Sequence, residues 1–199
     1  MSDKSLSIPN EILWAVIGLL LTIGGTFLEV HITNLPWRWN QDGIQTYALG
    51  VTYQIGAVLL VGCMGGKNAG ALSQIAYLVL GLIFYPVFGQ GGGLGYLNQP
   101  TFGYVLGFIF GAWICGFLAF KNPPKLEFLS LACLCGLFTI HISGLTYICV
   151  THFLTKNTED LILLWDAIMK YSIHTLPGQL VILCSVTVIS YLGRHLLFY

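Results

Sequence analysis

Six long apolar runs, separated by short polar or glycine-rich segments, account for most of the 199 residues of the chain. A helix that crosses the hydrocarbon core of a bilayer needs about 20 mainly apolar residues, and each run is close to or above that length. The pattern therefore predicts an all-α integral membrane protein, a bundle of six transmembrane helices in one domain over residues 1–199. The predicted spans cover residues 12–30, 47–64, 69–87, 101–120, 128–153 and 177–198.

A polar stretch between the fifth and sixth runs has a helical pattern of its own. Apolar residues recur there every three or four positions, which predicts an amphipathic helix from Thr158. These residues are Leu161, Leu164, Trp165 and Ile168. The segment that follows the first run contains Trp37 and Trp39, and tryptophan is typical of a membrane–water interface.

The composition excludes a soluble fold, because only 8% of the residues are charged and a typical soluble domain has about 25%. A surface that faces a lipid bilayer needs few charges. The formal net charge is +0, so nothing indicates a nucleic-acid partner. The six cysteines lie in or at the ends of apolar runs without a C-x-x-C pair, so we interpret them as small buried apolar residues and predict no metal site.

The basic residues predict how the chain is oriented in the membrane. With six spans both termini share one side, and five basic residues fall on that side, namely Lys4, Lys67, Lys121, Lys125 and Arg194. The other side has three, namely Arg38, Lys156 and Lys170. Because basic residues favour the cytoplasmic side, we predict a multi-pass plasma-membrane protein with both termini in the cytoplasm.

The sequence has no groups that would power transport or catalyse a reaction. Gly65-Gly66-Lys67 is not a phosphate-binding loop, because that motif requires glycine in place of Val61 and serine or threonine in place of Asn68. His141 and His152 are isolated, and no paired carboxylates, serine–histidine pair or metal cluster is found. We predict a protein that is not an enzyme, has no cofactor and takes any energy for uptake from a partner.

A glycine-rich segment between the third and fourth runs is the first candidate for ligand binding. Gly89 to Gly95 includes five glycines, and Tyr96, Asn98 and Gln99 follow it. Backbone and side-chain amides suit a neutral polar head group such as a urea, although the same composition also fits a flexible connector without a ligand. Several polar residues within or at the ends of the spans could line a pocket or pair with one another; they are Gln54, Gln74, Tyr77, Tyr104 and Gln179.

Small residues at intervals of about four positions predict close helix contacts. Gly103, Gly107 and Gly111 share one face of the fourth span, where packing within the chain is the favoured interpretation. In the first span, Gly18 and Thr22 form a smaller notch that could accept a helix of a partner.

Three segments of the chain closely resemble the BioY family. They are Pro86-Val87-Phe88 with the glycine-rich loop and Pro100 to Phe108, Thr52 to Ser73, and Leu176-Pro177-Gly178. The family consists of biotin-binding S components of energy-coupling factor (ECF) transporters. The resemblance implies a six-helix bundle with a biotin pocket that opens outward. It also implies that a transmembrane coupling subunit and ATPase subunits supply the energy.

The chain departs from the family pattern at three positions. Gln179 replaces an aspartate, Ile182 replaces a lysine three residues later, and Gly92 replaces a basic residue that is frequent in the loop. A carboxylate ligand would lack its usual cation, so either Arg38 or His174 compensates or the ligand differs from biotin.

The resemblance and the polar positions together predict the functional residues. The ligand pocket comprises Gln54, Gly91, Gly92, Gly93, Tyr96, Asn98, Tyr104 and Gln179, and the partner interface comprises Ala15, Gly18 and Thr22. Two alternatives stay open: a subunit of the same fold for another small vitamin or a biotin precursor, and a membrane scaffold that does not transport.

Overall fold

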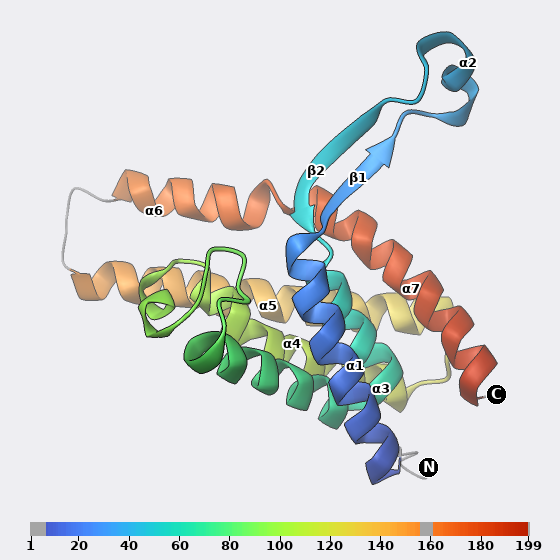
Figure 1. Cartoon of the computed structure of the whole chain (residues 1–199), viewed down its shortest axis with the longest axis horizontal. Coiled ribbons are helices and arrows are strands. Elements are labelled where there is room, and N and C mark those ends of the chain that lie inside the picture. The colour runs from blue at the N-terminus through green and yellow to red at the C-terminus, as the bar shows by residue number, and fades with distance from the viewer. Residues whose placement is uncertain (1–6, 156–160, 199) are drawn as a thin grey trace.

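The computed structural model of the chain describes residues 7–155 and 161–198. Helices surround a tightly packed interior, and a two-stranded hairpin extends from one end of the bundle (Figure 1). Within the described residues, five helical segments are long and apolar enough to cross a membrane, namely Ile8–Phe27, Gln54–Phe84, Phe102–Lys121, Leu126–Leu154 and Leu164–Leu197.

The second of these segments folds back on itself at Gly66. Helix α3 (Gln54–Val79) is interrupted there by a glycine with φ 79° and ψ −177°, and a π-helical turn (Leu80–Phe84) extends the second leg. A Cβ on Gly70 would lie 3.3 Å from the Cα of Gly62, so the two legs run against each other. The described residues therefore contain six helical legs, and the predicted break between the second and third spans lies in the Gly65 to Lys67 segment.

Helices α4 (Phe102–Lys121) and α5 (Leu126–Thr155) pack through the glycines that the sequence singled out. A Cβ on Gly103 would meet Tyr147, and one on Gly107 would lie 2.8 Å from the Cβ of Ser143. Gly111 lies in the same way against Ile140. These three glycines serve packing within the chain, the favoured interpretation of their spacing.

Helix α1 (Ile8–Phe27) turns its small residues inward rather than toward a partner. Ala15, Gly18 and Thr22 are buried against α3, where a Cβ on Gly18 would lie 2.5 Å from Val61. This burial contradicts the predicted partner interface, because a helix of another protein could reach these residues only by displacing α3. The opposite face of α1 exposes large apolar side chains, as lipid contact requires, among them Ile12, Leu13, Val16 and Leu20.

The first correction to the predicted helices is an antiparallel hairpin formed by β1 (Glu29–Thr33) and β2 (Thr46–Thr52). The prediction placed residues 28–30 and 47–52 in helical spans, because their apolar side chains run on without a break into the neighbouring helices. Strand pairing between His31 and Ala48, and a positive φ of 66° at Gly50, exclude a helix here.

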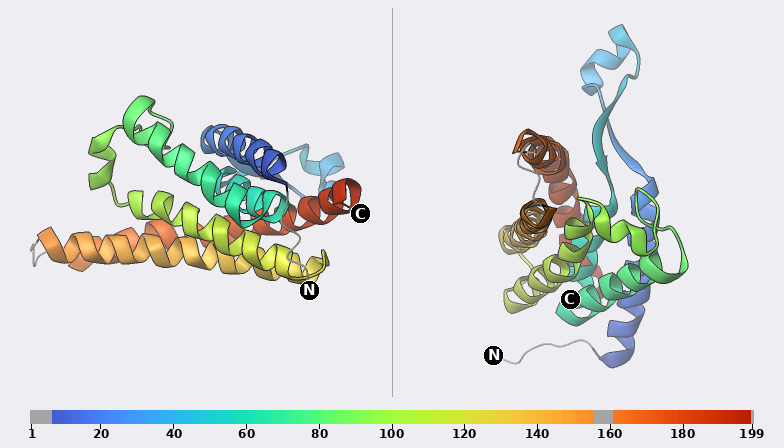
Figure 2. Two further views of the ribbon diagram at one scale, coloured as in Figure 1. Left: turned by 90° about the horizontal axis from the view of Figure 1, so that it is seen from below. Right: turned by 90° about the vertical axis from the view of Figure 1, so that its left-hand side faces the viewer.

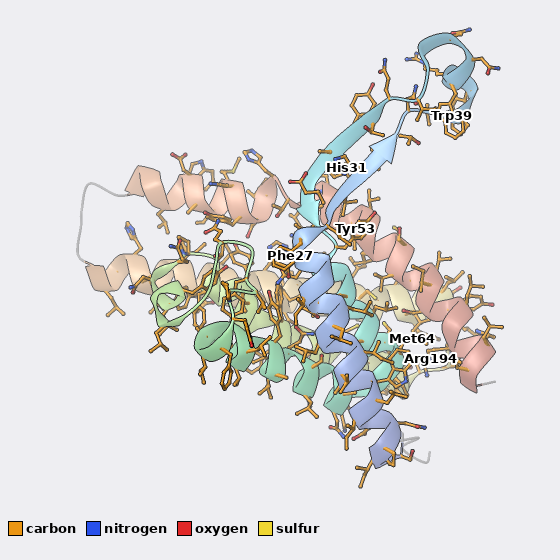
Figure 3. The ribbon with its side chains drawn as sticks, in the orientation of Figure 1. Phe27, His31, Trp39, Tyr53, Met64 and Arg194 are labelled. Carbon is orange, nitrogen blue, oxygen red and sulfur yellow. The ribbon has the colours of Figure 1, made fainter. Side chains whose placement is uncertain are left out.

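The tip of the hairpin lies far from the bundle and is fixed by local hydrogen bonds. It contains a short 3-10 helix (Pro36–Arg38) and α2 (Trp39–Asp42). The Asn34 side chain donates to the carbonyl of Gly43 and accepts from the backbone of Gln45, and the Trp39 indole donates to the carbonyl of Asn34. Figure 3 shows Trp39 at this tip, so Arg38 beside it is also distant from the helices.

The last helical segment is bent into two parts. Helix α6 (Leu161–Ile168) and a π-helical turn (Met169–Ile173) lead into α7 (Leu176–Phe198), and α6 lies along α5 (Figure 2). A helix over the predicted positions Leu161 to Ile168 is confirmed, whereas the predicted start at Thr158 lies outside the described residues. At 30 residues and about 45 Å, α5 is longer than a hydrocarbon core of about 30 Å, so it can cross a membrane with a tilt or with one end outside.

Candidate ligand-binding site

A cavity of about 350 Å³ lies at the end of the bundle where the hairpin joins it. This volume is within the range of roughly 300–1,000 Å³ that is usual for small-molecule sites. The hairpin, the start of α3, the glycine-rich loop, the start of α4 and the junction of α6 and α7 contribute its walls. The lining residues are Glu29, Gly50, Val51, Thr52, Gln54, Ile55, Gly89, Gln90, Tyr96, Thr101, Tyr104, Val105, Phe108, Tyr171, Thr175 and Gln179.

On one wall of the cavity, the amide of Gln54 is oriented by a buried tyrosine. The Gln54 Nε2 donates to the Tyr77 hydroxyl at 2.9 Å, and that hydroxyl donates to the carbonyl of Val87 at 2.9 Å. Tyr77 is fully buried, and its hydroxyl also lies 3.1 Å from Thr26 Oγ1. With Nε2 held in this way, the Oε1 of Gln54 is the atom that can accept a hydrogen bond from a ligand.

A chain of hydrogen bonds fixes a second lining amide, that of Gln179 at the start of α7. His141 Nε2 lies 2.7 Å from Gln179 Oε1, and His141 Nδ1 lies 3.0 Å from the Ser172 hydroxyl. That hydroxyl lies 2.6 Å from the hydroxyl of Tyr104. Because Oε1 only accepts, the histidine donates through Nε2, which leaves the Gln179 Nε2 as a donor for the cavity.

The glycine-rich loop is packed against the bundle and does not behave as a loose connector. A backbone bridge joins Phe88 and Gly91, and the buried Phe88 ring lies over Gly81, where an added Cβ would collide with the ring. Gly91 and Gly93 have φ values of 110° and 80°, which favour glycine. The path of the loop therefore depends on glycine at these positions.

The loop continues into a short 3-10 helix (Leu94–Asn98) that brings Tyr96 to the cavity. The Tyr96 hydroxyl lies 2.9 Å from Thr101 Oγ1. Burial raises the pKa of the Tyr96 phenol, and the hydrogen bond with Thr101 opposes this shift only in part. The phenol therefore stays protonated at neutral pH and can donate a hydrogen bond.

The structure brings four of the eight predicted pocket residues together, namely Gln54, Tyr96, Tyr104 and Gln179. The other four do not line the cavity, because the loop presents Gly89 and Gln90 to it instead. Gly91, Gly92 and Gly93 shape the loop, and Asn98 is exposed beyond it.

Several lining residues were not predicted from the sequence. Thr175 lies one helical turn before Gln179, a spacing that could have suggested it. Glu29 and Tyr171 had no comparable signal, because their positions depend on the hairpin and on the bend between α6 and α7.

Neither Arg38 nor His174, the two residues considered as cationic partners of a carboxylate ligand, lines the cavity. Arg38 is at the tip of the hairpin, and His174 is exposed and is not one of the lining residues. Ile182, in place of the lysine of the family, is buried against Gly56, whose Cβ would lie 2.7 Å from it. A different cation, Lys170, has its Nζ 5.2 Å from the ring centroid of the lining residue Tyr171.

Comparison with known proteins identifies the family. The sequence profile of the BioY family matches residues 3–197. The chain belongs to the BioY family. The resemblance seen in the glycine-rich loop and its flanks is thereby confirmed, and the matched BioY proteins are described as transporters rather than as enzymes.

Two relatives and one solved structure show how far the similarity extends. A probable biotin transporter BioY of Lysinibacillus sphaericus is 35% identical over 132 residues, which is 65% of this chain and 60% of that protein. An uncharacterized 21.2 kDa protein of the psbX-ycf33 intergenic region of Cyanophora paradoxa is 26% identical over 94% of this chain and 95% of its own length.

The solved structure is the S-component for biotin from an ECF-type ABC transporter, with a TM-score of 0.68. It is 20% identical in sequence, and the match covers 96% of this chain and 95% of that one. The likeness confirms the predicted fold, a membrane bundle of S-component type, with the hairpin as the correction to an all-helical chain. The BioY chain is thus a multi-pass membrane protein.

Proposed function

We propose that this BioY chain is the substrate-capture subunit of a biotin uptake transporter. The observation that carries the proposal is a pair of amides in the lining of the cavity that are held in opposite roles. Gln54 offers an acceptor and Gln179 offers a donor. The ureido ring of biotin has N–H donors and one carbonyl acceptor, so it can satisfy both amides at once.

The remaining lining suits the rest of the biotin molecule. Val105, Phe108 and Ile55 form apolar wall against which the sulfur-containing ring and the alkyl chain can pack. The hydroxyl of Tyr96 adds a donor, whereas the hydroxyl of Tyr104 donates to Ser172 and can only accept from a ligand. A site of this kind is mainly apolar with a few oriented polar groups, which is the usual design of a small-molecule pocket.

The carboxylate of biotin would lie toward the open side of the cavity, near Lys170. We expect Lys170→Gln to weaken biotin binding by about fivefold, or about 1 kcal/mol, because an exposed charge pair contributes little more than that. Binding of biotinamide, which has no carboxylate, should stay unchanged. The measurement is the Kd of each ligand by isothermal titration calorimetry with protein in lipid nanodiscs.

Lys125→Gln is the matched control, because Lys125 lies in the turn between α4 and α5 and does not line the cavity. An equal loss for biotin and biotinamide in Lys170→Gln would contradict an ionic role for this lysine.

The proposed direction of capture follows from where charge gathers at the two ends of the bundle. Glu11 at the start of α1 accepts a hydrogen bond from Asn68 beside the turn at Gly66, and Gly193 near the end of α7 contacts Met64. Both ends of the described chain therefore lie at the same end of the bundle as the Gly66 turn, and this end has most of the basic residues. Placing that side in the cytoplasm puts the cavity on the outer face.

Without an ATP-binding motif, the chain would depend on ECF coupling and ATPase subunits for release and import. Such partners would dock on a surface other than Ala15, Gly18 and Thr22, since these residues are covered by α3.

A ligand panel tests the proposed function directly. Biotin should raise the thermal unfolding midpoint of the purified protein and bind saturably at micromolar concentration or below. Desthiobiotin, which keeps the ureido group and the carboxylate, should also bind, whereas lipoate, which lacks the ureido group, should not. Binding of lipoate in preference to biotin would refute the assignment of the two amides.

A second candidate is a biotin derivative whose carboxylate is masked. Glu29 supports it, because this carboxyl group lies on the cavity wall and no lysine or arginine is among the lining residues that the structure describes. The same panel decides between the two: biotinamide would then bind more tightly than biotin.

A further inference from the structure

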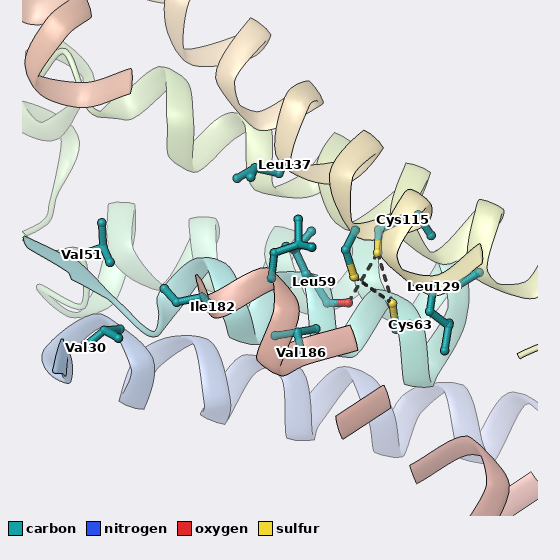
Figure 4. Packing of buried hydrophobic residues seen from close by; sticks show 13 residues of the cluster. Val30, Val51, Leu59, Cys63, Cys115, Leu129, Leu137, Ile182 and Val186 are labelled. Carbon is teal, nitrogen blue, oxygen red and sulfur yellow. Dashed lines mark hydrogen bonds between the residues drawn. The ribbon is translucent and has the colours of Figure 1, made fainter. Parts of the chain in front are cut away.

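Three of the six cysteines meet at one point in the interior, away from the ligand cavity. The Sγ of Cys63 on α3 lies 3.5 Å from the Sγ of Cys115 on α4 and 3.5 Å from the Sγ of Cys133 on α5. All three sulfurs lie within 4.8 Å of one another, and each residue is fully buried. Figure 4 shows the sulfurs of Cys63 and Cys115 turned toward each other, with Cys115 also directed to the carbonyl of Leu59.

The sequence predicts separate buried apolar side chains, because each cysteine lies in its own apolar run. Cys115 and Cys133 are 52 and 70 positions from Cys63. Only the packing of three different helices brings the sulfurs together. We propose that this three-cysteine cluster binds one Cu(I) ion.

The arrangement of the sulfurs fits a three-coordinate metal. With a metal–sulfur bond of about 2.3 Å, three sulfurs around a planar centre are about 4.0 Å apart. The observed separations, from 3.5 Å to within 4.8 Å, bracket that value, so small side-chain adjustments would complete the site. Soft thiolate ligands favour Cu(I), zinc and iron–sulfur clusters, and three-coordination then favours Cu(I) among these.

Zinc fits this cluster less well. A structural zinc ion takes four ligands in a tetrahedron, or three protein ligands with water in the fourth position. Among the described residues, only these three sulfurs come together here as possible metal ligands, and their full burial leaves no open position for water. Cu(I) is stable with two or three sulfur ligands and needs no fourth.

The charges around the cluster can balance. A Cu(I) ion bound by two thiolates has one net negative charge. The third cysteine stays a neutral thiol, and its sulfur completes the shell only as a weaker contact. The side chain of the buried Arg194 is held by the carbonyl of Ala119 at 2.6 Å and by the ring of Phe120, one helical turn beyond Cys115 on α4. The sum of copper, two thiolates and the guanidinium is zero, which burial in an apolar interior requires. Metal binding then releases two thiol protons.

A buried serine hydroxyl near the cluster also supports a bound metal ion. The hydroxyl of Ser190 on α7 is fully buried and has no hydrogen-bond partner that meets standard geometry in the described part of the chain, yet it lies near Cys63. As a donor it would stabilise a thiolate at Cys63, and hydrogen bonds of this kind orient and tune metal ligands.

Copper analysis of protein loaded during expression tests the proposal. Because the sulfurs are buried, we add copper to the growth medium, purify the full chain in detergent under anaerobic conditions with a Cu(I) chelator, and measure metals by mass spectrometry. We expect about one copper per chain. X-ray absorption should show only sulfur neighbours at about 2.3 Å.

The chain provides a matched control for this experiment. The variant C135A/C149A/C184A removes the three cysteines outside the cluster and should keep its copper, whereas C63A should retain less than about one tenth of it. If C63A does not yield folded protein, C115A and C133A take its place. Wild-type protein without copper, with zinc instead, or with nitrogen or oxygen neighbours would overturn the proposal, as would equal copper in C63A.

Discussion

Replacing Gln179 with leucine is expected to weaken biotin binding by about 100-fold, or about 2.7 kcal/mol. The leucine removes the donor that faces the cavity and leaves the ureido carbonyl of the ligand without a partner. It also leaves His141 Nε2 without its acceptor, and a buried unsatisfied group costs about 1–3 kcal/mol. The measurement is the biotin Kd by calorimetry in nanodiscs.

The control for this substitution is Gln99→Leu, which changes the same chemical group at an exposed position outside the cavity. Its Kd should match that of the wild type. A biotin Kd in Gln179→Leu within threefold of the control would contradict the assignment of Gln179 as the donor. His141→Ala should give a smaller loss than Gln179→Leu, since the histidine orients the amide and lies outside the lining of the cavity.

Replacing Gly116 with valine is expected to prevent stable folding, with a loss of more than about 4 kcal/mol. A Cβ at this position would lie 2.5 Å from the carbonyl carbon of Gly66 and 2.5 Å from the backbone nitrogen of Lys67. Backbone atoms cannot move aside as a flexible side chain can, so α4 would have to separate from the turn of α3. Thermal unfolding and size-exclusion chromatography measure the effect.

Gly24→Val is the control, because a Cβ on Gly24 has no neighbour within 4 Å. The same substitution should there change stability by less than about 1 kcal/mol. Equal unfolding midpoints for the two variants would show that contact between α4 and the turn is not required.

The apolar runs predicted the helices well, because lipid imposes one simple requirement on every span. Four of the runs, from residues 69, 101, 128 and 177, correspond closely to helical segments of the structure. The start of the second run was wrong because hydropathy does not distinguish an apolar strand from an apolar helix. Residues 47–52 are apolar enough for either, and their pairing with β1 over a distance in sequence decides the outcome.

The site was less predictable than the fold. Gln54 and Gln179 could be identified because an amide near the end of a span is costly in lipid and needs a reason to be there. The direction in which each amide points could not be predicted, because it depends on Tyr77 and His141 from other helices. The sequence singled out the glycines of the loop as pocket residues. In the structure they shape the loop and do not line the cavity, so any effect on a ligand is indirect.

The turn at Gly66 also sets how much of the membrane voltage a bound anion experiences. Gln54 is twelve helical residues from that turn, about 18 Å along the axis of a hydrocarbon core of about 30 Å. With the turn at the cytoplasmic boundary, a negative ligand beside Gln54 has crossed only about two fifths of the field. The energy of a unit charge changes by about 2.3 kcal/mol per 100 mV when it crosses the whole field. Capture of an anion against a negative interior therefore costs about 1 kcal/mol per 100 mV. Capture would therefore depend only weakly on voltage, and the larger electrical cost falls on the later step of release.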